Sequence, residues 1–353
     1  MRAISRRRTA TAVAAFVVCL AAGCGTADGP VALPEPSMTP TVSEPTTAPP
    51  TVVPAPDPVR LVRWHGPVEA LFVHPLILRP RLAFHRDAQA RGFLDYFITA
   101  YEFRALLDEL WRNGWTLVDV HRAAAGTVRV PEGRKPLVLY EDDANYYDYF
   151  RGHGLARRLV LDGSGRVRAE LPDGDLSTAD VVPLVEEAVA AHPELSAEGA
   201  KGVLALTGFE GLLGEHDPQA PAAHARLVRL ADRLRAEGWT FASHTNGHID
   251  LSTASPAEIR EDSARWRAQA RSVLGPVDVL VYPYGARPSA AGARELVGLG
   301  FPIQIDIDIR ATRRRFGGAV LMSRRHVDGF AFAAPARQRP FYSVKAVRDP
   351  RRP

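Results

Sequence analysis

Two pairs of side chains in this sequence have the types and spacing needed for metal-assisted hydrolysis. His244 and His248 stand four residues apart, and Asp142 and Asp143 are adjacent. Neutral imidazole nitrogens and carboxylate oxygens are good ligands for zinc and similar divalent cations. Two histidines and one carboxylate leave coordination positions open, as a catalytic metal requires, and a second carboxylate then remains as a base. Taken alone, each pair also fits solvated charge or an ordinary turn.

The positions of these residues relative to the expected strands make the pairs more informative. Asp142 follows an apolar run at 136–140, His244 follows an expected strand at 239–242, and Pro283 follows one at 277–282. On a helical turn, His244 and His248 would project from one face. Because parallel strands of an α/β fold end on a common face, the three clusters are expected to meet there.

Strands and helices alternate over about 200 residues, which predicts an α/β fold with a mainly parallel sheet covered by helices. The pattern alone fits an open sheet or a barrel. Further expected strands lie at 115–120, 202–206 and 301–309. Expected helices lie at 103–112, 181–191, 222–237, 256–273 and 290–299, with Ser255 as the N-cap of the fourth.

The first residues predict export. Four arginines, a short apolar run and small residues before Cys24 are typical of a bacterial lipoprotein signal at 1–23, with Cys24 lipidated after cleavage. An ordinary signal with an incidental cysteine is the alternative, and the export route, general or twin-arginine, is left open. Ten prolines between 25 and 58 predict an extended tether at 24–58. The expected location is the outer face of the bacterial cell membrane.

Composition narrows the remaining classes. With 353 residues and 46% hydrophobic residues, the chain can bury a sizeable core, and two cysteines exclude a disulfide-built scaffold. The arginines of the expected signal account for the whole net charge of +4, so the remainder is neutral and predicts no nucleic-acid partner. The expected domain spans 59–335. A basic tail spans 336–353, where solvated charge or contact with acidic polymers or anionic lipid are the two interpretations.

The order of the clusters resembles the polysaccharide deacetylase family. Asp142-Asp143, His244-Thr245-x-x-His248 and Pro283-Tyr284 occur in that family's order and at compatible spacings. Four longer stretches are similar to a subgroup of bacterial lipoproteins in the family, and the similarity runs from about residue 68 to about 330. These stretches are Phe72–Ile77, Ile98–Phe103, Asp142–Tyr147 and Thr207–Gly211.

The resemblance implies a distorted (β/α) barrel. It also implies hydrolysis of an amide bond other than a peptide bond, namely the removal of N-acetyl groups from a glycan, with removal of O-acetyl groups as the alternative. It implies that Asp142 is the catalytic base and that Asp143, His244 and His248 bind a divalent metal, zinc first, with cobalt or nickel as alternatives. Pro283 and Tyr284 would form a groove wall, with the Tyr284 backbone N–H facing the developing oxyanion. His326 is the candidate general acid, with a surface role as the alternative.

Departures from the family pattern lie close to the expected site. Glu141 stands where a hydrophobic residue is usual, and it would be a further ligand, a tuner of pKa or a solvated charge. Ala144 replaces a frequent glycine. Val281 occupies the position where many members place an arginine that orients the base. Arg324 or Arg325 is a candidate to contact the base or an anionic glycan instead.

Several other residues have two interpretations. The aromatic residues Tyr140, Tyr146, Tyr147, Tyr149 and Phe150 would form either a sugar-stacking wall or core packing. His74 would line the groove or serve in the core or a turn. Asp306 and Asp308 alternate with isoleucines, which favours an exposed strand face.

The leading function is therefore a lipid-anchored, metal-dependent deacetylase of an N-acetylated polysaccharide at the cell surface. The alternative is a catalytically weak glycan- or wall-binding lipoprotein with the same fold. A solute-binding lipoprotein is a third class, but it gives no reason for the His and Asp pairs. The glycan, its linkage and the oligomeric state are left open.

Overall fold

The computed structural model describes residues 60–85 and 87–353. The expected signal at 1–23, the lipidated Cys24 and the tether at 24–58 lie outside the described residues. Among the described residues, no helix has both the length and the apolar character needed to cross a membrane.

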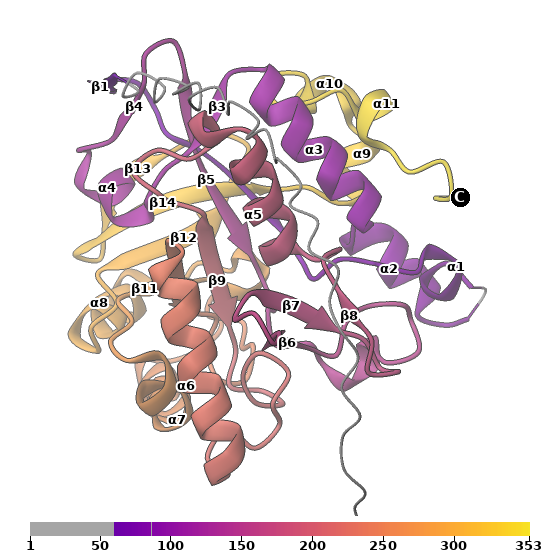
Figure 1. Cartoon of the computed structure of the whole chain (residues 1–353). Coiled ribbons are helices and arrows are strands. Elements are labelled where there is room, and N and C mark those ends of the chain that lie inside the picture. Colours follow the sequence, from indigo (N-terminus) through magenta and orange to yellow (C-terminus); the bar gives the residue numbers. More distant parts are fainter. Residues whose placement is uncertain (1–59, 86) are drawn as a thin grey trace, which may run out of the picture. The chain divides into compact units, whose positions relative to one another are not determined.

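Seven parallel strands close into a barrel in the order in which they occur along the chain (Figure 1). The pairing of the sixth strand with the seventh, and of the seventh with the first, completes the ring. This closure decides between an open sheet and a barrel, and it confirms the barrel that the family resemblance implied. The strands are β2 (Glu69–Val73), β5 (Lys135–Glu141), β9 (Gly202–Leu206), β10 (Trp239–Ser243), β11 (Val279–Val281), β12 (Ile303–Ile307) and β14 (Ala319–His326).

Alternate residues of the barrel strands pack into two separate clusters. Val138 and Tyr140 of β5 join Val281 and Ile305 in the inner cluster. Leu137 and Leu139 join the outer cluster, which includes side chains of the surrounding helices. Because strand side chains point to opposite faces in turn, the apolar run at 136–140 is buried on both faces, as expected for a parallel sheet.

Helices surround the barrel, and four of the five predicted helices begin and end within two residues of the predicted positions. Ser255 caps its helix as predicted, in a capping box with Glu258. The helices are α1 (Pro80–Ala83), α2 (Ala90–Tyr96), α3 (Ala100–Arg112), α4 (Val120–Ala125), α5 (Val181–Ala191), α6 (Pro221–Ala236), α7 (Pro256–Leu274), α8 (Ala290–Gly298), α9 (Gly329–Phe332), α10 (Pro335–Gln338) and α11 (Val344–Val347).

The remaining strands lie outside the ring or beside it. The strand predicted at 115–120 is shorter, because Asp119 caps α4 and ends it early. β1 pairs with β4, β3 with the first residues of β5, and β13 with β14, while β6, β7 and β8 form a small antiparallel sheet. Their bounds are β1 (Leu61–Arg63), β3 (Trp115–Leu117), β4 (Arg129–Pro131), β6 (Arg158–Leu161), β7 (Val167–Glu170), β8 (Leu176–Ser177) and β13 (Arg313–Phe316).

His121 of α4 is held between two carboxylates, and this gives the fold a pH-dependent contact. Its Nε2 lies 2.8 Å from Asp278, just before β11, and its Nδ1 lies 3.4 Å from Asp119. Hydrogen bonds to Asp119 and Asp278 raise the pKa of His121 to about 10. The ring is therefore charged at neutral pH and ties α4 to the entry of β11.

We expect His121→Gln to destabilise the protein at pH 6 and to have no effect above pH 10. Because the pKa is raised on folding, this stabilisation is complete below the unfolded pKa of 6.5 and is lost as pH rises through about 10. The imidazole is partly exposed, so the effect is of the order of 1 kcal/mol, as for surface pairs. Urea unfolding of both proteins across this pH range measures it, and a difference that stays constant with pH would contradict it.

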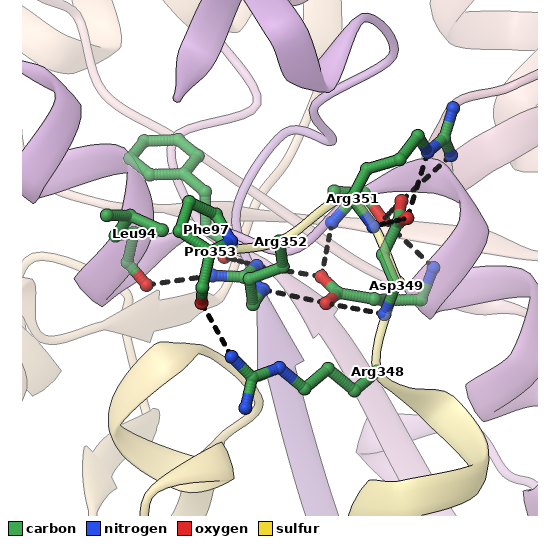
Figure 2. Close-up of polar contacts among 9 residues, drawn as sticks. Leu94, Phe97, Arg348, Asp349, Arg351, Arg352 and Pro353 are labelled. Carbon is green, nitrogen blue, oxygen red and sulfur yellow. Dashed lines mark hydrogen bonds and ion pairs between the residues drawn. The ribbon is translucent and has the colours of Figure 1, made fainter. Parts of the chain in front are cut away.

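The basic C-terminal segment, predicted as a solvated tail at 336–353, instead packs as part of the fold (Figure 2). Arg352 is buried and forms a two-bond ion pair with Glu102, with Nε–Oε1 and Nη2–Oε2 distances of 2.7 Å. It also donates to the carbonyls of Leu94 and Phe97 at the end of α2. Glu102 is already part of the capping box of α3 with Thr99. One arginine therefore ties the chain's last residues to the junction of two helices.

We expect Arg352→Met to lower the free energy of unfolding by about 3–5 kcal/mol, because it leaves the Glu102 carboxylate buried without its cation. Lys345→Met is the matched control, since Lys345 is exposed on the same segment and loses the same charge. Chemical denaturation measures both. Equal unfolding midpoints for the two variants would show that the buried pair contributes no more than a surface charge.

Candidate metal centre and active-site cavity

The three predicted clusters meet at one cavity. Asp142 follows β5, His244 follows β10 and Tyr284 lies just beyond β11, so all three come from the carboxyl ends of barrel strands. The cavity has a volume of about 730 Å³. This is the end of the barrel where βα loops build active sites.

Asp143, His244 and His248 form a compact group of metal-binding donors. One donor atom from each residue lies within 4.8 Å of the other two. The Nδ1 of His244 lies 2.8 Å from the Val281 carbonyl, which only accepts, so Nδ1 carries the proton and Nε2 keeps its lone pair. Burial lowers the pKa of His244 to about 3, so the ring is neutral at physiological pH. The donor set therefore fits a divalent cation such as zinc.

The histidines do not lie on a helical turn, contrary to the expectation from their spacing. Residues 244–248 form a loop in which Thr245 and His248 have φ values of 63° and 50°, in the left-handed region. The loop is held by Asp262 of α7, whose two carboxylate oxygens accept the backbone N–H groups of Asn246 and Gly247 at 2.7 and 2.9 Å. This brings the two rings to a centroid distance of 4.9 Å.

Asp143 is oriented by hydroxyl groups. The Tyr147 hydroxyl donates to Asp143 Oδ1 at 2.7 Å and lies 2.9 Å from the Thr207 hydroxyl. Asn145 ties the same loop to the end of β9, because its side chain exchanges hydrogen bonds with the backbone of Thr207. The loops after β5 and β9 are thus held together around the carboxylate.

Asp142 lies beside the metal-binding group and is paired with an arginine from inside the barrel. Its Oδ2 is 2.7 Å from Nη1 of Arg324, which is fully buried on β14 and lies 3.9 Å over the ring of Phe72. The Asp142 Oδ1 atom is buried and has no hydrogen-bond partner among the described residues. Arg324 thus provides beside Asp142 the positive charge that an arginine at position 281 would have provided. The adjacent arginine, Arg325, lies near Glu69 instead.

Glu141 is not a further ligand and is not solvated. It is fully buried and is absent from the donor group formed by Asp143, His244 and His248. Burial and the neighbouring Asp180 and Asp142 raise the pKa of Glu141 well above its usual range. Burial therefore favours the neutral form of this carboxyl group.

Tyr284 lines the cavity, whereas Pro283, in the same 3₁₀ turn, is not part of the lining. Pro283 is buried, while the Tyr284 ring is 69% exposed and lies edge-on to His248 at 4.5 Å between centroids. The φ of Tyr284 is 58°, again in the left-handed region. The turn therefore presents an aromatic side chain at the rim beside a metal-binding histidine.

The aromatic set divides between the two interpretations left open above. Tyr140, Tyr146 and Phe150 are core residues. Tyr147 and Tyr149 line the cavity together with Phe209 from the loop after β9. Tyr149 and Phe209 are 43% and 52% exposed, which leaves their ring faces open to a ligand.

His326 and His74 both line the cavity. The Nδ1 of His326 is 3.1 Å from the buried Asp328 carboxylate. The Nδ1 of His74 is 2.9 Å from the Tyr96 carbonyl, so His74 holds its proton on Nδ1 and keeps Nε2 as an acceptor. Asp306, in contrast, is not on an exposed face: it is buried in an ion pair with Arg287.

Three residues of the site were not identified from the sequence. Asp262 and Asp328 are buried carboxylates that orient the histidine loop and His326, and Thr207 contacts the tyrosine that holds Asp143. The sequence pattern could have indicated Asp262, because Ile259 and Trp266 place position 262 on the buried face of α7. A charged residue on an apolar helix face points to a specific partner.

One family model matches part of the chain. Residues 195–301, which include the two histidines and Pro283-Tyr284, match the family model described as polysaccharide deacetylase. No curated protein matches the chain.

Among solved structures, the chain is similar to the Streptococcus pyogenes deacetylase PplD in complex with acetate, at 14% identity and a TM-score of 0.47, over 75% of this chain and 93% of that one. It is similar to IcaB from Ammonifex degensii at 16% identity and a TM-score of 0.45, over 75% and 93%. It is also similar to a de-N-acetylase from Aggregatibacter actinomycetemcomitans at 14% identity and a TM-score of 0.46, over 75% and 96%.

Proposed function

We propose that this chain is a deacetylase of the polysaccharide deacetylase type, which removes N-acetyl groups from a cell-surface or extracellular polysaccharide in a metal-dependent reaction; the family model that residues 195–301 match supports this. The observation that carries the proposal is the meeting of Asp143, His244 and His248 beside the buried Asp142 at one open cavity. Asp143 and the two histidines would hold the cation, zinc first, with cobalt or nickel as alternatives. When bound, the cation would polarise the acetyl carbonyl and lower the pKa of a water molecule.

Asp142 has the environment of a general base. Its Oδ2 is paired with Arg324, and its Oδ1 has no other partner among the described residues, so that oxygen is available to accept a proton from the attacking water. The backbone N–H of Tyr284 is proposed as the donor to the developing oxyanion, a type of contact that contributes about 3–4 kcal/mol in other hydrolases.

The substrate is proposed to be a sugar chain. The exposed rings of Tyr149, Phe209 and Tyr284 surround the cavity, and such rings give sugars an apolar face to stack on. The cavity volume of about 730 Å³ is within the range of small-ligand sites. An O-acetylated glycan is the alternative substrate, because the same groups would serve ester hydrolysis.

His326 is proposed to protonate the leaving amine, since it lines the cavity and its ring is held by the Asp328 carboxylate, 3.1 Å from Nδ1. We expect His326→Gln to lower kcat about 100-fold or more, as measured by steady-state acetate release. His74→Gln is the matched comparison from the same cavity, expected to affect KM more than kcat. If His74→Gln lowers kcat about 100-fold and His326→Gln does not, the acid is His74.

The test of the function combines metal content with product release. Purified protein loaded with zinc, cobalt or nickel should contain one cation per chain by mass spectrometry and release acetate from N-acetylchitooligomers. A parallel assay on an O-acetylated glycan distinguishes amide from ester hydrolysis. If cation is bound but no acetate is released from any acetylated glycan or peptidoglycan fragment, the chain is instead a glycan- or wall-binding protein with this fold.

We also propose that the protein acts at the outer face of the bacterial membrane, anchored through a lipid on Cys24. The basic start, the apolar run and the small residues before Cys24 support this, and the proline-rich segment that follows would be the tether. Cys24→Ser should release the protein from the membrane fraction, which fractionation with metabolic lipid labelling measures.

A further inference from the structure

A second cavity lies at the opposite end of the barrel from the metal centre. It has a volume of about 670 Å³ and is lined by residues that begin β10 and precede β11 and β12. Three arginines stand around it: Arg235 from the end of α6, and Arg267 and Arg271 from α7. Figure 1 shows α6 and α7 side by side at this part of the barrel.

Two of the guanidinium groups have no acidic partner. Among the described residues, neither Arg267 nor Arg271 forms an ion pair, and they stand four residues apart on one helix, where like charges repel. Burial and the charge of Arg271 lower the pKa of Arg267. The partial negative charge at the C-terminal end of α7 stabilises the charge of Arg271, which lies in the last turn. It does not stabilise Arg267, because the effect of the helix dipole is limited to the last turn.

The other charged groups at the cavity are already paired. Arg235 lies 2.9 Å from Asp232 and also donates to the Leu274 carbonyl. Asp278, the acidic side chain of the lining, is paired with the charged His121. The lining therefore keeps an excess of positive charge.

Two of the three arginines are held in place before any ligand arrives. Arg267 lies over the ring of Phe301 at 5.0 Å, and Arg235 lies over Phe241 at 5.3 Å. Gly300, with a φ of 84°, leaves the space that Arg267 uses, because a Cβ there would lie 3.1 Å from its Nη2. Side chains that are ordered in advance lose less entropy on binding.

From this arrangement we propose that the cavity binds a phosphorylated sugar or polyol through Arg267 and Arg271. One guanidinium group can donate hydrogen bonds to two phosphate oxygens at once. A phosphate also offers more oxygens and more negative charge than a carboxylate does. The cavity is larger than a phosphate group alone needs, which leaves room for the attached sugar or polyol. The site is separate from the proposed deacetylase centre and does not depend on it.

Titration calorimetry with glycerol 3-phosphate on the full chain tests the proposal, with glycerol as the uncharged comparison. The double variant Arg267→Gln/Arg271→Gln should weaken binding about 10-fold or more. Arg294→Gln, which removes an exposed charge from α8, is the control and should bind as the unmodified protein does. The double variant Arg267→Lys/Arg271→Lys keeps both positive charges. It should bind glycerol 3-phosphate with an affinity between those of the unmodified protein and the double glutamine variant, which would show that a folding defect is not the cause of weaker binding.

The outcomes separate this site from the catalytic one. Acetate release from N-acetylchitooligomers should be the same in the double glutamine variant and the unmodified protein. If the unmodified protein does not bind glycerol 3-phosphate, or if the double variant binds it equally well, the proposal is wrong. Equal binding of inorganic phosphate and glycerol 3-phosphate would also overturn it, because the attached polyol would then contribute nothing.

Discussion

Asp143→Ala should abolish both stoichiometric metal binding and acetate release, whereas Asp142→Asn should keep the metal and lose most of the rate. Asp143 is one of three donors, and a site of three protein ligands loses affinity steeply when one is removed. Asp142 is not in that donor group, and its proposed role is proton transfer, which contributes about 100- to 10,000-fold in enzymes.

Mass spectrometry of the loaded proteins and a steady-state acetate assay separate the two effects. Asp148→Asn is a suitable control, because it removes an exposed carboxylate from the same segment of chain outside the cavity lining. If Asp142→Asn loses the cation and Asp143→Ala retains it, the two roles are exchanged. If neither variant changes metal content, the metal centre is not where we place it.

Arg324→Met should both destabilise the protein and impair the base. The side chain is fully buried, and its removal leaves the Asp142 charge in the barrel interior without a cation. Breaking a buried pair in this way costs about 3–5 kcal/mol. The rate of acetate release should also fall, because the Asp142 carboxylate loses the ion pair that holds its Oδ2 in place.

A double variant distinguishes this pairing from a simple packing defect. Arg324→Met/Asp142→Asn removes both charges, so it should be more stable than Arg324→Met alone, as measured by chemical denaturation. Arg324→Lys keeps the positive charge but lacks the planar guanidinium group. Its rate of acetate release should therefore lie between those of Arg324→Met and the unmodified protein. Additive losses in the double variant would indicate that Arg324 acts through packing and not through Asp142.

The sequence predicted most of the elements because their signals are local. Apolar spacing and caps such as Ser255 lie within each helix, so α5 and α7 begin where expected. Closure of the barrel depends on pairing β14 with both β12 and β2, and the first and last strands are far apart in the chain. No local pattern records such a pairing, and only the family resemblance indicated it.

The site was predicted in its residue types but not in its local geometry. The spacing of His244 and His248 was taken for a helical turn, but a loop held by Asp262 brings them together. Arg324 was one of two candidates, and its alternation with Val320 and Met322 along β14 points it inward. The C-terminal arginines looked like solvated charge, because nothing nearby in the sequence identifies Glu102 as the partner of Arg352.

The left-handed backbone at Asp143, Thr245, His248 and Tyr284 bears on attempts to make this protein more heat-resistant. Such conformations cost of the order of 1–3 kcal/mol each in residues other than glycine. Laboratory evolution that selects only for survival on heating would therefore favour glycine or asparagine at these positions. The most heat-resistant variants from such a screen would include some in which a metal-binding residue has been replaced. The screen should therefore also select for acetate release.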